Sequence, residues 1–177
     1  MLSHSEGALI GTLAAGENVD ALISLAGAGR SIDKIIVEQI AKQSQELSEN
    51  ARTAFDEIKE NGQTTNYSQY LESIFRPSVQ PYIASWMKYD PAEEIAKIEI
   101  PVLIINGTFD LQVDVTDAEI LKEAKPEAEL LILENMNHIF RNIEGENLEN
   151  TKAYNEPQRP LHPELVPELV EFIRSIE

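Results

Sequence analysis

The sequence predicts an α/β fold, with a small parallel sheet that is flanked by helices on both sides. Three short apolar runs predict strands, at residues 20–27, 101–107 and 129–133. Continuous apolar runs of this length are typical of parallel strands that are buried on both faces. Stretches with helical periodicity separate the runs, and such an alternation is typical of a parallel α/β sheet. The 177 residues, of which 42% are hydrophobic, are sufficient for one domain with a packed core.

The first predicted helix runs from Ser5 to Ala15. Its small and apolar residues suit close packing on a sheet, and Gly16 is a helix stop. Only Met1 and Leu2 precede the turn that leads into this helix, so a strand of about two residues is expected there. The whole sheet is therefore predicted to be three to four strands wide.

The residues between the first and the second apolar run have a helical character. From Ser31 to Lys59, apolar residues recur mostly every three or four residues, which predicts one or two amphipathic helices with Ser31 as the N-cap. A shorter helix is expected over Asn66–Phe75. We interpret residues 31–89 as a helical insertion, a lid that covers the site. The alternative is a set of ordinary packing helices.

The last third of the chain returns to the strand–helix alternation. A helix is expected to start at Asp90-Pro91, and another to run from Thr116 or Asp117 to about residue 124. Residues 142–160 are rich in Asn, Glu and Pro and predict a solvated loop. A final helix is expected from Pro163 or Pro167 to Ile176. Four of its apolar residues are predicted to face the sheet: Leu169, Val170, Phe172 and Ile173.

Three polar residues follow the ends of strand-like runs, namely Ser5, Asp110 and His138. Open α/β sheets place their functional sites at the carboxyl ends of parallel strands, so these side chains are expected to meet. The chain order of serine, acid and histidine is that of hydrolases with a G-x-S-x-G motif. The spacing between Asp110 and His138 leaves room for one helix and one strand.

Other interpretations exist for each member of this set. A serine at the start of a helix can be a cap, and an aspartate after a glycine can be a turn residue. Asp114 is a second candidate acid, although it fits the approach to the next helix better. His4 is expected to point away from the proton that must move, and His162 is expected to be a loop or cap residue.

Three segments of the sequence resemble the α/β-hydrolase family. Ser3-His4-Ser5-Glu6-Gly7 looks like the family's nucleophile elbow, with Ser3 in place of the first glycine. The segment Ile100–Val113 resembles the strand and turn that bear the acid, and Met136-Asn137-His138 is similar to the histidine loop. The resemblance is to bacterial enzymes of the serine-aminopeptidase-like and carboxylesterase kind. It covers this whole chain but only the second half of the family's domain, a partial α/β-hydrolase domain that starts at the elbow.

The resemblance implies a role for each residue. Ser5 would be the nucleophile, His138 the general base and Asp110 the residue that orients the imidazole. The backbone N–H of Glu6 would be half of the oxyanion hole, and the loop that supplies the other half has no counterpart here. The implied substrates are carboxylic esters or related small acyl compounds, including amides. Trp86 and the tyrosines of residues 31–89 would either line an acyl pocket or belong to the core.

A second hypothesis is a catalytically weak or inactive hydrolase fragment, which needs a missing N-terminal half or a partner chain. Without the upstream strands, the sheet would have an exposed apolar edge. Such an edge favours self-association, or binding of a chain that supplies the missing strands.

Composition excludes several other classes of function. The 14 basic and 31 acidic residues give a net charge of -17, which disfavours nucleic acid and anionic membranes as partners. No apolar run approaches the ~20 residues of a membrane-spanning helix, and no signal peptide is recognisable, so a cytoplasmic location is the default expectation. The absence of cysteine excludes disulfides and thiolate-bound zinc. No metal-binding or phosphate-binding motif occurs, and no cofactor is expected.

Overall fold

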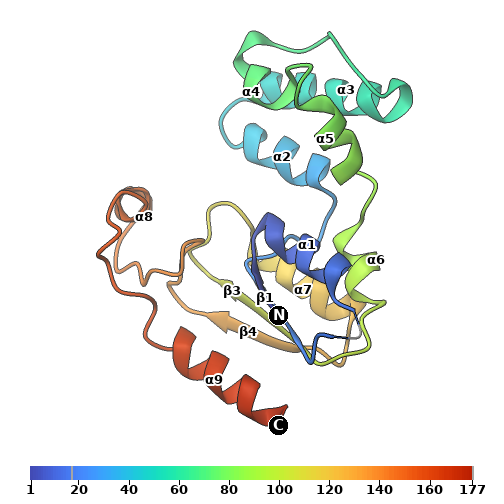
Figure 1. Ribbon diagram of the computed structural model, residues 1–177. Helices are drawn as coiled ribbons and strands as arrows, with labels where there is room; N and C mark the ends of the chain where they lie inside the picture. The colour runs from blue at the N-terminus through green and yellow to red at the C-terminus, as the bar shows by residue number, and fades with distance from the viewer. Residues whose placement is uncertain (17, 177) are drawn as a thin grey trace. The chain divides into compact units, whose positions relative to one another are not determined.

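The computed structural model describes residues 1–16 and 18–176, which form two compact units (Figure 1). The first unit, the α/β unit, comprises Met1–Gly29 and Pro91–Glu177. The second, the helical unit, comprises Arg30–Asp90. No helix within the described residues has the length and apolar character needed to cross a membrane.

The α/β unit is built on one sheet of four parallel strands, which confirms the predicted fold class. The strands pair in chain order, so each strand lies beside the one that precedes it in the chain. Strand β1 has three residues, one more than expected. The bounds are Leu2–His4 for β1, Leu22–Leu25 for β2, Val102–Gly107 for β3 and Glu129–Leu133 for β4.

Alternate residues of the inner strands face opposite sides of the sheet, as the pleat requires. Val102 and Ile104 of β3 belong to one core, which includes residues of α6 (Pro91–Ile95) and α7 (Val115–Ala124). Leu103 and Ile105 belong to the core on the other face, with α9. Figure 1 shows α9 on one side of the sheet and α1 (Glu6–Ala14), α6 and α7 on the other, as predicted.

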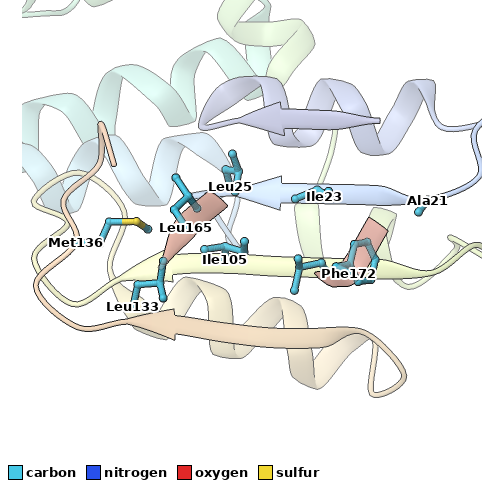
Figure 2. Close-up of a cluster of buried hydrophobic side chains, with 9 residues drawn as sticks. Ala21, Ile23, Leu25, Ile105, Leu133, Met136, Leu165 and Phe172 are labelled. Atoms are coloured by element: carbon cyan, nitrogen blue, oxygen red, sulfur yellow. The ribbon is translucent and has the colours of Figure 1, made fainter. Parts of the chain in front are cut away.

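Helix α9 (Leu165–Ser175) closes one face of the sheet, but the predicted orientation of its apolar residues is wrong in part. Figure 2 shows Leu165 and Phe172 over strands β2 and β3, and Leu169 packs against the same core. Val170 and Ile173 were expected to face the sheet, yet they are 39% and 48% exposed. The apolar residues of α9 form two adjacent stripes, and helical periodicity lets only one stripe face the core.

Residues 142–160 contain a helix, so the prediction of a solvated loop is wrong. Helix α8 spans Asn147–Ala153, and its buried residues are Asn150 and Ala153. A helix that buries an asparagine and an alanine gives no apolar periodicity, which explains why the sequence pattern did not predict it.

The helical unit contains an α-helical hairpin followed by short helices. The predicted stretch 31–59 forms α2 (Ile32–Ala41) and α3 (Gln45–Asn61), and α3 ends at Gly62 with a φ of 77°. The expected helix over 66–75 is a 3₁₀ turn followed by one helical turn. The remaining bounds are Gln69–Leu71 for the 3₁₀ helix η1, Glu72–Phe75 for α4 and Gln80–Trp86 for α5.

This unit has a hydrophobic core of its own. The rings of Phe55 and Phe75 meet edge to face at its centre, with centroids 4.8 Å apart. Tyr67 packs against Phe75, whereas the Tyr70 side chain is exposed. An independent core is compatible with an insertion, and its role as a lid stays a prediction.

Candidate active site

Ser5 occupies a sharp turn between β1 and α1. Its φ of 56° and ψ of -123° lie outside the regions that residues with a side chain normally adopt. A bond of 2.9 Å from the Ser5 N–H to the Leu25 carbonyl ties this turn to β2. The hydroxyl makes no capping bond with α1, so the alternative interpretation of Ser5 as a helix cap is wrong.

The structure brings Ser5, His138 and Asp110 together in a chain of hydrogen bonds. His138 Nε2 lies 3.0 Å from Ser5 Oγ, and His138 Nδ1 lies 2.8 Å from Asp110 Oδ2. The side chains of His138 and Asp110 are 5% and 1% exposed. Burial strengthens electrostatic interactions between such groups, because little water screens them.

Asp110 is held in place by its own backbone turn. Its Oδ1 atom accepts hydrogen bonds from the N–H groups of Gln112 (2.8 Å) and Val113 (2.9 Å). Asp110 is therefore a turn residue and the partner of His138 at the same time, so the two interpretations do not exclude each other. One oxygen fixes the carboxylate, which leaves the other directed at the imidazole.

The loop that carries Asp110 and the loop that carries His138 are in close contact. A Cβ atom on Gly107 would lie only 2.0 Å from the Met136 carbonyl oxygen, so only glycine fits here. The same oxygen accepts a bond of 3.0 Å from the N–H of Phe109. The ends of β3 and β4 therefore position the acid and the imidazole as a pair.

His4 contacts both the backbone and the ring of His138. Its Nε2 lies 2.9 Å from the His138 carbonyl oxygen, and its ring lies between those of His138 and Phe140, with centroids 4.7 and 4.6 Å away. Burial, and then the charge of His138, lower the pKa of His4, which favours the neutral ring. A neutral ring with its proton on Nε2 donates to the carbonyl, so His4 supports the backbone of His138.

The other candidate residues have structural roles. Asp114 lies at the approach to α7, as expected, and caps it with its Oδ1 3.0 Å from the Thr116 N–H, so the helix begins at Val115 and not at Thr116 or Asp117. His162 is buried, and its Nε2 lies 3.0 Å from the Glu134 carbonyl oxygen. Glu6 is the first residue of α1, and the oxyanion role of its N–H stays a prediction. Over residues 1–16 and 18–176, no cluster of acidic and histidine side chains is arranged to hold a metal ion.

Two buried asparagines beside the site were missed by the sequence analysis. Asn137 precedes His138, and its Oδ1 accepts bonds from the N–H groups of Ile139 and Arg141. Its Nδ2 donates to Asn150 of α8, which is fully buried. The asparagine before the histidine is a typical turn residue, a signal that could have identified Asn137. Nothing in the pattern around Asn150 distinguishes it from the polar residues of a loop.

No family model and no curated protein matches this sequence. Solved structures do match its fold. The structure of Rv0554 from Mycobacterium tuberculosis aligns with a TM-score of 0.52 and 16% identity, over 99% of this chain and 65% of that one. A meta-cleavage product hydrolase from Pseudomonas fluorescens IP01 aligns with a TM-score of 0.51 and 16% identity, over 99% of this chain and 64% of that one. The chain has the α/β-hydrolase fold.

The α/β-hydrolase fold is present here in part, because the chain spans less than two thirds of the length of these two proteins. This agrees with the expected partial α/β-hydrolase fold. In this fold, a serine on a strained strand-to-helix turn is the arrangement of a nucleophile elbow. Ser5 lies on such a turn between β1 and α1, and its role as the nucleophile stays a prediction.

Proposed function

We propose that this chain is a serine hydrolase, which cleaves carboxylic esters or related small acyl substrates with Ser5, His138 and Asp110. One observation carries the proposal: the Ser5 hydroxyl, on a strained turn, lies 3.0 Å from His138 Nε2. The hydrogen bond between His138 Nδ1 and Asp110 supports it further. A buried carboxylate beside Nδ1 favours the tautomer that leaves Nε2 free to accept a proton.

The proposed reaction has two steps, acylation of Ser5 and hydrolysis of the acyl-serine. His138 Nε2 takes the hydroxyl proton as Ser5 Oγ attacks the acyl carbon, and Asp110 stabilises the imidazolium that forms. The imidazolium then gives its proton to the leaving oxygen as the bond to the acyl carbon breaks. Water attacks the acyl-serine in the same way, with His138 as base, and restores Ser5 with release of the acid. The N–H of Glu6 is proposed to stabilise the oxyanion in both steps.

The decisive experiment is labelling with a fluorophosphonate probe, which reacts with activated serines. We expect the wild type to label rapidly, and Ser5→Ala to lose the label. Ser3→Ala is the matched control, because Ser3 is two residues away and its hydroxyl donates to the Ile23 carbonyl instead. If the wild type and Ser5→Ala label equally, the proposal fails. Hydrolysis of p-nitrophenyl esters and of p-nitroanilides then separates esterase from peptidase activity.

A further inference from the structure

Helix α8 contacts the loop that carries Asp110 at two places. Asn150 and Tyr154 are four residues apart, on the same side of the helix or just beyond its end. Asn150 Nδ2 donates to the Phe109 carbonyl oxygen at 2.6 Å. The Tyr154 hydroxyl accepts a bond of 3.2 Å from Gln112 Nε2. The contacted residues, Phe109 and Gln112, lie before and after Asp110 in the chain. The segment of α8 and Tyr154 therefore contacts the acid-bearing loop on both sides of Asp110.

The side-chain amide of Asn150 also reaches the histidine loop. Its Oδ1 accepts a bond of 2.9 Å from Asn137 Nδ2, while its Nδ2 donates to Phe109. Phe109 directly precedes Asp110, and Asn137 directly precedes His138. A single buried side chain therefore connects the residue before the acid with the residue before the base.

We propose that Asn150 is a positioning residue, which sets the distance and orientation between Asp110 and His138. For its effect on catalysis, this proposal rests on the proposed serine hydrolase function. The amide group is required because the site needs one donor for a carbonyl and one acceptor for an amide N–H. Aspartate at this position could not donate to the Phe109 carbonyl, and leucine could make neither bond. Either change leaves buried polar groups without partners, which favours a rearrangement of the two loops.

The test compares Asn150→Leu and Asn150→Asp with Thr151→Ala. Thr151 is the matched control, because it is the next residue of α8 and is exposed, and its hydroxyl donates within the helix to the Asn147 carbonyl. Nuclear magnetic resonance first measures the low-field signal of the proton between His138 Nδ1 and Asp110. We expect this signal in the wild type and in Thr151→Ala, and its shift or loss in both Asn150 variants.

Hydrolysis of p-nitrophenyl butyrate supplies the second measurement. We expect kcat of the Asn150 variants to fall by up to ~10²-fold with little change in KM, because a small displacement of catalytic groups has a large effect on rate. Rates are compared per folded molecule, determined from urea unfolding curves. If Asn150→Leu does not fold, Asn150→Asp, which has the same shape, decides the question.

The two proposals fail in different ways. If the folded Asn150 variants keep both the proton signal and kcat, Asn150 is not a positioning residue. If the wild type neither reacts with the fluorophosphonate probe nor hydrolyses the ester, but the variants still lose the proton signal, the positioning role stands and the serine hydrolase proposal fails.

Discussion

The side chain of Ser3 occupies the space that a side chain at Gly11 would need. A Cβ atom on Gly11 would lie 2.5 Å from Ser3 Oγ and 2.8 Å from Ser3 Cβ. Ser3 stands where the nucleophile elbow of the family has its first glycine, and Gly11 lies in α1, which packs on β1. Gly11 of the helix therefore leaves room for the side chain of Ser3, which replaces the first glycine of the motif.

The first prediction is that the effect of Gly11→Ala on stability reverses in a Ser3→Gly background. In the wild type, the added methyl group overlaps Ser3 and should lower the free energy of unfolding by about 1–3 kcal/mol. With Ser3→Gly the remaining neighbour is Met1 Sδ at 3.4 Å, an ordinary contact, and alanine should then stabilise the helix by up to about 1 kcal/mol. Urea unfolding of the four proteins of this double-mutant cycle gives both values. Equal effects in the two backgrounds would show that Ser3 and Gly11 do not interact.

The second prediction concerns the tautomer of His138. In Asp110→Asn, the side-chain oxygen can still accept the two N–H bonds of the turn, which directs the new NH₂ group at His138 Nδ1. Nδ1 must then accept, so the ring proton moves to Nε2, which can no longer take the proton of Ser5. We expect kcat for an ester to fall by about 10⁴-fold without loss of the fold.

Asp114→Asn is the control for this change, since it alters the neighbouring acid, which caps α7. Asparagine caps helices as well as aspartate does, so activity should stay at the wild-type level. Loss of activity in Asp114→Asn, with activity retained in Asp110→Asn, would assign the acid to Asp114.

The third prediction is a pH dependence of stability that originates at Asp33 in the helical unit. Burial alone would raise the pKa of this carboxyl, but bonds from Lys59 and Arg52, both 2.7 Å long, outweigh it and lower the pKa to about 2. A lowered pKa stabilises the folded state above the unfolded pKa, near 3.8, and this contribution is lost as pH falls towards 2. The contribution at neutral pH is about 2 kcal/mol.

Urea unfolding of the wild type and Asp33→Asn between pH 7 and pH 2 measures this contribution. The stability difference between the two proteins should be constant from pH 7 to about 5 and should then decline. Asp56→Asn is the matched control, because Asp56 pairs with the same Arg52 from an exposed position. A stability difference that does not change with pH would disprove the role of Asp33.

The fourth prediction is self-association through the edge of the sheet at β1. Within the described residues β1 pairs with β2 only, and nearby apolar side chains are exposed: Leu2 by 53%, Ile10 by 57% and Leu13 by 43%. The net charge of -17 repels a second copy, so association should increase with salt. Sedimentation velocity should show less association for Ile10→Lys than for Tyr70→Lys, which changes an exposed residue of the helical unit. A wild type that stays monomeric at high salt would contradict self-association through β1.

The sequence predicted the parts of the fold that rest on strong apolar patterns. The strands β2, β3 and β4 coincide with apolar runs. Such runs indicate buried parallel strands, which holds for β2 and β3, whereas β4 lies at an edge of the sheet and is only partly buried. Helix α8 was not predicted, and Val170 and Ile173 of α9 were placed on the wrong face, for opposite reasons. The buried residues of α8 are the polar Asn150 and the small Ala153, whereas α9 has more apolar residues than one face of a helix can bury.

For the candidate site, the sequence predicted which residues would meet but not what holds them. Ser5, Asp110 and His138 follow strand ends, and topology alone brings such positions together. The contacts of His4 with the His138 carbonyl, and of Asn150 with Phe109, depend on the path of loops. No local sequence pattern specifies that path, because these bonds join residues far apart in the chain.

The position of β1 has a consequence for thermal inactivation. Ser5 is attached to the sheet through a three-residue strand at its edge, whereas Asp110 and His138 follow inner or longer strands. Short edge elements open locally at free energies below that of global unfolding. Opening of β1 breaks the bond from the Ser5 N–H to Leu25 and removes the hydroxyl from an otherwise intact acid–imidazole pair. Heating should therefore abolish turnover reversibly several degrees before the core unfolds, with the amides of β1 exchanging first.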